Sequence, residues 1–250
     1  GPNTRKDQVK PSSEDKFVLK NCDLIIAVGG DGTLLGAARK FGFNGIPVLG
    51  INLGTLGFLT DIAPNEITSN LKSIIFGKFI KDDRFFLEAQ VNGKAEHNIA
   101  LNEVTLHAKS ISTLIEYEVY IDKYFVFRQK ADGIIVNTPT GSTAYSLSGN
   151  GPIVHPKVKS ITLLPMFPHS LNTRPLIVNE DSEIEIIIKG DRKVGLSLDS
   201  HKIISLKKED SILISKAKSK LCLIHPEDHD FYKASRNKLG WSLGIVQNHS

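Results

Sequence analysis

The chain has 250 residues and a formal net charge of +4, and 40% of its residues are hydrophobic and 23% charged. These values are ordinary for a globular protein with one large or two small domains. The lysines are scattered rather than grouped as in a nucleic-acid-binding protein, and no apolar run approaches the roughly 20 residues that span a membrane. Cys22 and Cys222 lie far apart, which is no disulfide framework and favours a cytoplasmic protein.

The first residues are polar and have no periodicity, so we expect residues 1 to about 15 to form a flexible arm. Leu24 to Val28 is a short apolar run rich in β-branched residues, which predicts a strand of a parallel sheet buried on both faces. Gly29-Gly30-Asp31-Gly32 follows, and Thr33 to Lys40 has the pattern of a helix. The stretch therefore predicts a strand, a glycine turn and a helix N-terminus.

This geometry suits a phosphate group, because the free N–H groups and the helix dipole point toward it. An acid in the turn is unusual, since its carboxylate repels phosphate, so Asp31 indicates catalysis or a metal ion. A structural role stays open, because Asp is common in turns and at N-caps. The turn is not a dinucleotide-binding fingerprint, since Leu35 takes the place of the third glycine, and the chain has no Walker motif.

Ile46 to Ile51 predicts a second buried strand, which completes a βαβ pattern and a parallel sheet. Glu66 to Phe76 has the apolar spacing of an amphipathic helix. From about residue 80 the pattern changes to short β-rich segments separated by turns, which predicts a β-sandwich or a related double sheet. Asp230 to Gly240 returns to helical or irregular structure.

The predicted fold class is therefore α/β plus all-β, with an N-terminal Rossmann-like α/β domain followed by a C-terminal β-sandwich-like domain. The boundaries that we expect are 1–15 for the arm, 16–80 for the α/β domain, 81–225 for the β-rich domain and 226–250 for a C-terminal segment.

A second informative stretch, Ala131 to Pro152, begins as a buried strand and continues into a turn rich in hydroxyl groups and glycine. The hydroxyls offer many uncharged donors and acceptors, and Tyr145 offers a stacking face, which together suit a nucleoside. A Ser/Thr turn that caps its own helix would explain the same pattern.

Asn102 and Glu103 interrupt an otherwise apolar β segment between the two stretches. One of them should point inward, and a buried Asn or Glu needs hydrogen-bond partners such as ribose hydroxyls. A strand end or a bulge would explain the pair equally well. His225 and His229 have the i,i+4 spacing of a zinc site, but no third ligand is evident, so we predict no metal there.

Together these stretches resemble the NAD kinase family, particularly its proteobacterial branch, from about Cys22 to Trp241. The matching motifs are Gly29-Gly30-Asp31-Gly32-Thr33, Asn102-Glu103, Ala131-Asp132-Gly133, Thr138-Pro139-Thr140-Gly141-Ser142-Thr143-Ala144-Tyr145-Ser146-Leu147-Ser148, Pro165 to Leu171, Arg174-Pro175-Leu176 and Lys238-Leu239-Gly240-Trp241. The first of these is shared with diacylglycerol-kinase-like and phosphofructokinase-like enzymes, whereas the motif from Thr138 to Ser148 is specific.

The resemblance implies transfer of the γ-phosphoryl group of ATP, or in some members of polyphosphate, to the 2′-hydroxyl of the adenosine ribose of NAD⁺. It implies that Asp31 is the general base, with Mg²⁺ or another divalent cation on the donor phosphates. The residues that it implies for NAD binding are Gly30, Asp31, Gly32, Asn102, Glu103, Asp132, Thr140, Thr143, Ala144, Tyr145, Ser148 and His201. Among these, Asp132 is expected to reach a substrate held by the neighbouring subunit.

The family fold is an α/β domain plus a β-rich NAD-binding domain, with the C-terminal segment returning to the first. Family members usually have a further strand and helix before the glycine turn, so the resemblance implies a shortened α/β domain here. It also implies a cytoplasmic homotetramer or homodimer that binds neither nucleic acid nor membrane.

Three departures from the family pattern stand out. Gly149-Asn150-Gly151 replaces Ala-Gly-Gly, His201 stands where many relatives have Gln, and Lys130 replaces a common Arg and so loses bidentate bonding. Two alternatives remain open. One is a lipid kinase of the diacylglycerol-kinase type, which should lack Ala131-Asp132-Gly133 and the motif from Thr138 to Ser148. The other is a nucleotide-binding sensor without catalysis.

Overall fold

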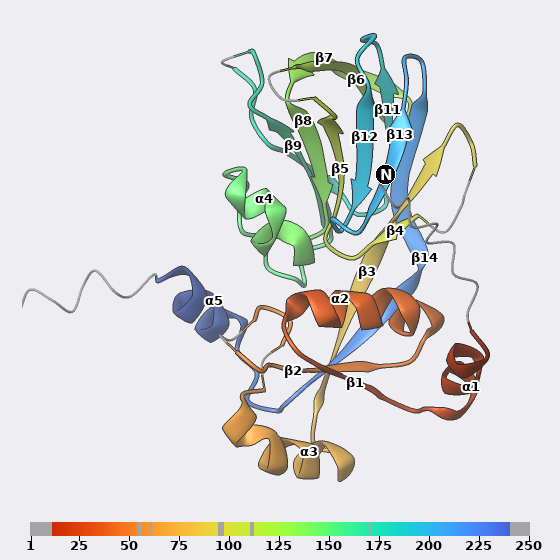
Figure 1. Cartoon of the computed structure of the whole chain (residues 1–250). Helices are drawn as coiled ribbons and strands as arrows, with labels where there is room; N and C mark the ends of the chain where they lie inside the picture. The colour runs from red at the N-terminus through yellow and green to blue at the C-terminus, as the bar shows by residue number, and fades with distance from the viewer. Residues whose placement is uncertain are drawn as a thin grey trace, which may run out of the picture. The chain divides into compact units, whose positions relative to one another are not determined.

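The computed structural model describes residues 12–54, 57–60, 62–94, 98–110, 113–170 and 172–240. The chain divides into two compact units, the first containing residues up to Arg84 and from Ser219 onward, the second running from Phe85 to Lys218. The strands β3 (Ile80–Val91) and β14 (Ser211–His225) run from one unit into the other (Figure 1). Within the described ranges no helix is long and apolar enough to cross a membrane.

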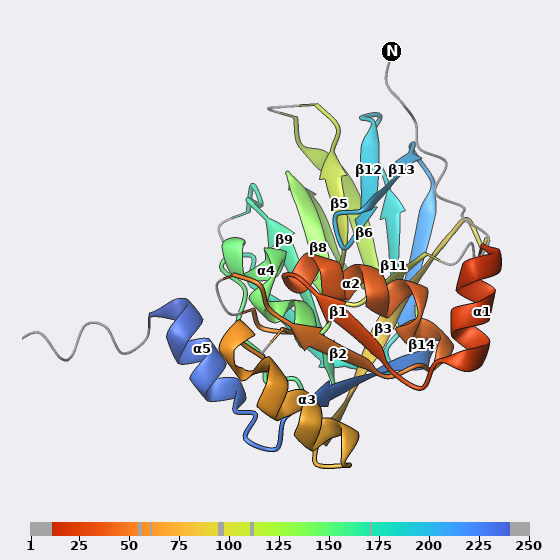
Figure 2. The same cartoon turned by 60° about the horizontal axis from the view of Figure 1, so that its bottom comes forward.

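The first unit is built around two parallel strands. Its elements are α1 (Ser13–Asn21), β1 (Ile25–Val28), α2 (Asp31–Lys40), β2 (Val48–Ile51), α3 (Ile67–Ile75), the start of β3, the end of β14 and α5 (Phe231–Leu239), with 3₁₀ turns at Gly42–Asn44 and Pro64–Glu66. β2 pairs in parallel with β1 on one side and with Leu223 and Ile224 of β14 on the other. Helices α2 and α3 lie on opposite faces of the β1–β2 pair (Figure 2). The predicted βαβ unit is confirmed.

The prediction that β1 is buried on both faces is wrong. Ala27 is buried, but Ile26 and Val28 are 43% and 49% exposed. β1 is the last strand in the hydrogen-bonded order of its sheet. The apolar cluster that includes Ile74 of α3 covers Leu49 and Ile51 of β2 and does not extend to β1. A buried central strand and an edge strand with one apolar face uncovered have the same composition, so the sequence could not separate them.

Helix α1 begins inside the segment that we expected to be a flexible arm. Ser12 caps it, because its hydroxyl accepts the N–H of Asp15 at 3.1 Å while the Asp15 carboxylate accepts the N–H of Ser12 at 3.0 Å. Lys40 at the end of α2 forms an ion pair with Asp15 at 2.6 Å. The expectation for residues 12–15 is therefore corrected by a capping box, a signal that is present in Ser12-Ser13-Glu14-Asp15. Residues 1–11 lie outside the described residues.

The second unit contains the short strands that the sequence predicts. They are the end of β3, β4 (Ile99–Ala100), β5 (Glu103–Ala108), β6 (Ile115–Ile121), β7 (Tyr124–Ala131), β8 (Gly133–Asn137), β9 (Ser160–Met166), β10 (Leu176–Asn179), β11 (Ile184–Ile188), β12 (Val194–Leu198), β13 (Lys202–Leu206) and the start of β14. Six of them form one sheet in the order β10-β9-β8-β5-β12-β13, and β7, β6, β11 and β14 are neighbours in the other. All these pairings are antiparallel.

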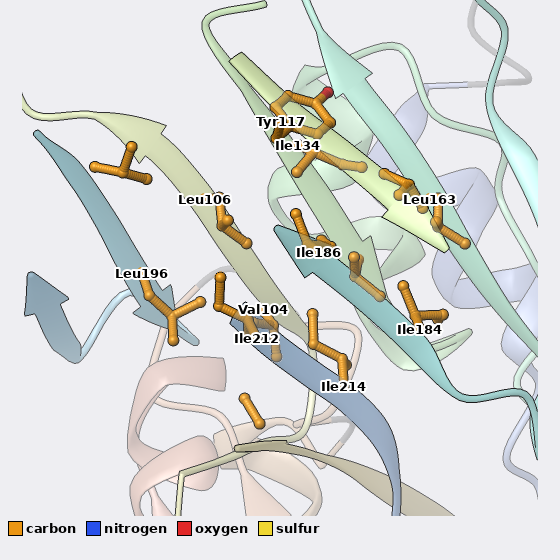
Figure 3. Close-up of a cluster of buried hydrophobic side chains, with 14 of the residues drawn as sticks. Val104, Leu106, Tyr117, Ile134, Leu163, Ile184, Ile186, Leu196, Ile212 and Ile214 are labelled. Carbon is orange, nitrogen blue, oxygen red and sulfur yellow. The ribbon is translucent and has the colours of Figure 1, made fainter. Parts of the chain in front are cut away.

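The core of this unit joins residues from both sheets. Figure 3 shows Val104, Leu106 and Leu196 of the six-stranded sheet with Ile184, Ile186, Ile212 and Ile214 of the other, all in one buried cluster. In β11 buried and half-buried residues alternate, as expected for a strand with one face in a core. The predicted double sheet is therefore confirmed. The segment after β8 forms a 3₁₀ helix, Thr140–Thr143, and the short helix α4 (Tyr145–Ser148).

Candidate active site

In the first unit, the Asp31 carboxylate organises the loop that follows β2. Asp31 is the first residue of α2, and Gly30 is its N-cap. One carboxylate oxygen accepts the N–H of Phe58 at 3.0 Å. The other accepts the N–H groups of Leu59 and Thr60 at 3.2 and 3.3 Å and the Thr60 hydroxyl at 3.2 Å. Asp31 is only half-buried, so the carboxylate can also reach a ligand.

Gly57 permits this contact. A Cβ atom at residue 57 would lie 2.0 Å from an Asp31 carboxylate oxygen and 2.4 Å from the Thr60 hydroxyl. Beside the loop, the Lys238 ammonium of α5 lies 5.6 Å from the centroid of the Phe58 ring, a distance at which cation–π attraction acts. The loop after β2 is thus held by Asp31 on one helix and contacted by a cation on another.

In the second unit, five buried side chains carry polar atoms that have no hydrogen-bond partner among the described residues. One is Ser160 Oγ, at the start of β9. The other four are Asn102 Oδ1, Glu103 Oε2, Asn137 Oδ1 and Ser146 Oγ. The four residues are 8%, 4%, 0% and 0% exposed, respectively. Buried polar groups are normally hydrogen-bonded, so several buried polar atoms without a partner, here called orphan atoms, are expected where a ligand binds. The expectation that one residue of the Asn102-Glu103 pair points inward holds for both.

Glu103 is the most perturbed of these groups. Its burial, and then the negative charge of Asp199, raise the pKa of its carboxyl group from 4.5 to about 8, although the backbone N–H of Tyr145 favours the ionised form. At neutral pH the group is therefore largely protonated and can donate a hydrogen bond as well as accept one.

Several hydroxyls of the predicted nucleoside-binding turn hold the turn itself. The Thr138 hydroxyl accepts the N–H of Gly141 at 3.2 Å and also donates to the carbonyl of Leu101, outside the turn, at 2.6 Å. The Ser142 hydroxyl donates to the carbonyl of Pro139 at 2.7 Å. The Thr143 hydroxyl contacts the carbonyl of Thr140 at 3.4 Å. The self-capping interpretation is thus correct for part of the motif.

The other predicted residues of this turn differ in how far their side chains are exposed. Thr140 is buried, Ala144 is half-buried, and Tyr145 and Ser148 are exposed at the start and end of α4. The exposed Tyr145 ring, 46% accessible, leaves a face on which a base could stack. Gly141 lies so close to the Asn102 backbone that a Cβ atom would meet the Asn102 carbonyl oxygen at 2.2 Å, which fixes the turn against the Asn102-Glu103 pair.

Asp132 and His201 lie in turns at the ends of strands. Both are exposed, Asp132 between β7 and β8 and His201 at the end of the turn from β12 to β13. Gly30 and Gly32 are also exposed, in the first unit. The structure thus gathers Asn102, Glu103 and the turn from Thr138 to Ser148 and leaves Asp132 on the surface.

Sequence reasoning missed Asn137, Ser146 and Asp199. Asn137 ends a wholly apolar strand, which is a visible signal for an inward polar group. Ser146 is one of many hydroxyls in the motif, and nothing in the sequence marks it as the buried one. Asp199 accepts backbone N–H groups from residues almost a hundred positions away, a relationship that local patterns cannot show.

His225 and His229 form a stacked pair, with ring centroids 3.9 Å apart and an interplanar angle of 19°. His225 Nε2 lies 3.7 Å from a carboxylate oxygen of Asp82. In the described part of the chain no group of three His, Cys, Asp or Glu side chains could hold a metal ion.

Comparisons with known proteins agree with this arrangement. Residues 3–79 match the family model described as the ATP-NAD kinase N-terminal domain, and residues 101–226 match the ATP-NAD kinase C-terminal domain. An NAD kinase of Pseudomonas fluorescens strain Pf-5 is 47% identical over 235 residues, which are 92% of this chain and 79% of that protein. An NAD kinase of Pseudomonas putida strain F1 has the same identity and coverage.

Two solved structures share the fold. The yeast NADH kinase complexed with NADH matches with a TM-score of 0.85 and 31% identity, covering 94% of this chain and 71% of that one. The NAD kinase of Archaeoglobus fulgidus in complex with ATP matches with a TM-score of 0.73 and 29% identity, covering 89% of this chain and 84% of that one. The identity to curated relatives and the match of both domain models establish that this chain belongs to the NAD kinase family.

Proposed function

We propose that the chain transfers the γ-phosphoryl group of ATP to the 2′-hydroxyl of the adenosine ribose of NAD⁺, which yields NADP⁺ and ADP. Family membership supports the reaction. The observation that carries the substrate site is the group of buried orphan atoms on Asn102, Glu103, Asn137 and Ser146. Vicinal ribose hydroxyls supply donors and acceptors together, which this mixture of an amide, a protonated carboxyl and a hydroxyl can satisfy.

Asp31 is the group that we assign to the reacting hydroxyl. The 2′-oxygen forms a bond to the γ-phosphorus while the bond from that phosphorus to the β–γ bridging oxygen breaks, and the hydroxyl proton passes to the Asp31 carboxylate. In a loose transition state the proton leaves late, so a weak base that orients the hydroxyl is sufficient. Asp31 suits this role because the loop 58–60 fixes its carboxylate, so little reorganisation is needed.

Mg²⁺ enters with ATP as part of the phosphoryl donor. The described residues contain no group of three acidic, His or Cys side chains for an all-protein cage, and Mg²⁺ commonly binds through substrate phosphates with one or two carboxylates. In this proposal the ion would be held by the donor phosphates, which leaves the Asp31 carboxylate to accept the hydroxyl proton. When bound, Mg²⁺ neutralises the charge on the donor phosphates.

The first experiment incubates the protein with NAD⁺, Mg²⁺ and ATP and follows NADP⁺ with a coupled NADP⁺-dependent dehydrogenase, with polyphosphate replacing ATP in a parallel sample. NADP⁺ formation is expected with ATP, and the parallel sample determines whether polyphosphate is also a donor. NAD⁺ binding without turnover would instead support a sensor and overturn the proposal.

The role of Asp31 is tested with Asp31→Asn, which should abolish NADP⁺ formation and leave NAD⁺ binding largely intact. Thr60→Val is the matched control, because it removes one donor to the carboxylate but keeps the carboxylate itself. If Thr60→Val is as inactive as Asp31→Asn, Asp31 acts by holding the loop. If Asp31→Asn keeps near-normal turnover, the assignment is wrong.

A cytoplasmic homotetramer or homodimer completes the proposal, in which Asp132 contacts the substrate of a neighbouring subunit. Its exposed side chain is compatible with such a contact. Mixing inactive Asp31→Asn and Asp132→Asn proteins under subunit exchange should restore part of the activity, because some mixed sites contain both intact residues. Sedimentation gives the number of subunits, and activity that does not recover would mean that both residues serve one subunit's own site.

A further inference from the structure

Asp199 and Thr138 form almost all of the hydrogen bonds to the backbone of residues 101–103. Asp199 accepts three N–H groups: one carboxylate oxygen accepts that of Leu101 at 2.9 Å, and the other accepts those of Asn102 at 2.8 Å and Glu103 at 3.2 Å. The N–H of Asp199 donates to the carbonyl of Glu103 at 3.0 Å. Thr138 donates to the two remaining carbonyls. Its hydroxyl donates to that of Leu101 at 2.6 Å and its N–H to that of Asn102 at 2.9 Å.

Asp199 is itself built into a constrained turn. It is 8% exposed and has a φ of +43°, and the next residue, Ser200, has a φ of +57°. The N–H of His201 closes the turn by donating to the carbonyl of Leu198 at 3.0 Å. Two successive residues at positive φ are the geometry of a type I′ turn, in which Asp and Asn are tolerated. This tight hairpin turn therefore holds the Asp199 carboxylate against the backbone of residues 101–103.

The backbone groups and the side chains of Asn102 and Glu103 differ in whether the protein satisfies their hydrogen bonds. Backbone groups of Asn102 and Glu103 are satisfied by Asp199 and Thr138, whereas Asn102 Oδ1 and Glu103 Oε2 are buried and lack partners among the described residues. A carboxylate that accepts three N–H groups makes charge-assisted bonds, which are stronger than neutral ones. The side chains are thus held in place for something other than the protein.

We propose that Asp199 is a positioning residue for NAD recognition: its carboxylate fixes the backbone from Leu101 to Glu103 and so presents the Asn102 and Glu103 side chains to the substrate. This inference rests on the proposed function. In this role Asp199 acts through Asn102 and Glu103, whose backbone it binds, and not on the reacting atoms themselves. The same buried negative charge also favours the protonated form of Glu103, so Asp199 sets both the place and the protonation state of that side chain.

The test is Asp199→Asn, which keeps a residue that tolerates positive φ but removes the charge and one acceptor oxygen. We expect the KM and the dissociation constant for NAD⁺ to rise at least tenfold while kcat changes less than about threefold, because the lost contacts hold ground state and transition state alike. We also expect the pH midpoint of NAD⁺ binding, near 8 if it follows Glu103, to move to lower pH. A residue that only stabilises the fold, with no charge acting on Glu103, would leave that midpoint unchanged.

Asp122→Asn is the matched control. Asp122 also lies in a hairpin turn at positive φ, +51°, and its carboxylate also accepts a backbone N–H, that of Glu183 at 2.9 Å. This control should leave NAD⁺ binding and its pH midpoint unchanged. If Asp199→Asn folds and binds NAD⁺ within twofold of the wild type with the same midpoint, the inference is wrong. Failure of the wild-type protein to form NADP⁺ would instead overturn the proposed function.

Discussion

Asn137 on β8 stands directly opposite Glu103 on β5, and one side-chain oxygen of each is buried without a partner in the described structure. Directly opposed residues on an antiparallel pair have Cβ atoms about 4.5–5.5 Å apart, so the two side chains lie together. The Asn137 amide already donates to the carbonyl of Thr138 at 2.9 Å. The pair therefore presents one amide oxygen and one largely protonated carboxyl group side by side.

Glu103→Gln should make stability less dependent on pH. In the folded protein Glu103 keeps its proton up to about pH 8, whereas at its ordinary pKa of 4.5 it ionises much earlier. Folding thus takes up a proton between these values. The contribution of Glu103 to stability is fully present below about pH 4.5 and is lost as the pH rises through 8. Glutamine is neutral throughout and avoids this loss.

Urea denaturation at pH 5.5 and pH 8.5 measures the effect. The Gln variant should exceed the wild type in free energy of unfolding by about 2–4 kcal/mol at pH 8.5, and by much less at pH 5.5. The exposed Glu183 gives a control, since Glu183→Gln should shift neither curve. An advantage of the same size at both pH values would show that Glu103 is ionised in the folded protein. NAD⁺ binding should weaken in the same variant.

Gly57→Ala should impair catalysis more than folding. The new methyl group would meet the Asp31 carboxylate at 2.0 Å, so the loop or the carboxylate must move. A misplacement of about 1 Å at a reacting group can cost roughly a hundredfold in rate, so we expect kcat to fall at least tenfold. Gly54→Ala in the same loop is the control, because nothing lies within 4 Å of a Cβ atom at residue 54. Equal activities of the two variants would contradict this account.

Thr138→Val should destabilise the second unit. Valine has the shape of threonine but leaves the Leu101 carbonyl without the 2.6 Å bond from the hydroxyl, and the N–H of Gly141 without its acceptor. Leaving buried backbone groups unsatisfied costs about 1–3 kcal/mol. Thr138→Ser keeps the hydroxyl and should recover most of that loss. Thermal unfolding of the three proteins distinguishes them, and a valine variant as stable as the serine variant would refute the hydroxyl's structural role.

The fold could be predicted from the sequence where the periodicity was unambiguous. The glycine turn before α2 and the alternation in β11 each have a local cause, and both are in the structure. The exposed face of β1 could not be predicted, because it depends on where α3 packs. The full length of β14, Ser211–His225, is also hidden in the sequence, since Lys216, Lys218 and Lys220 interrupt its apolar pattern.

The candidate site likewise contains some residues that could be predicted from the sequence and some that could not. Asp31, Asn102 and Glu103 were visible because charged or polar residues interrupt apolar or glycine-rich stretches. Asp199 was not, because its bonds join positions as distant as 101 and 199. The hydroxyl-rich turn was predicted as a ligand-binding segment, yet local sequence could not tell the hydroxyls that hold the turn, such as Ser142, from the buried and unpaired Ser146.

The path of β14 has a consequence for synthesis on the ribosome. The second unit is one continuous stretch, Phe85 to Lys218, and all of its chain has been made before the final segment emerges. The first unit begins at the N-terminus, but β2 receives one of its two parallel neighbours only from Leu223 and Ile224. Until that segment has been made, the backbone N–H and C=O groups on this edge of β2 have no strand to pair with. The sheet of the first unit is therefore completed only after the whole of the second unit has been synthesised.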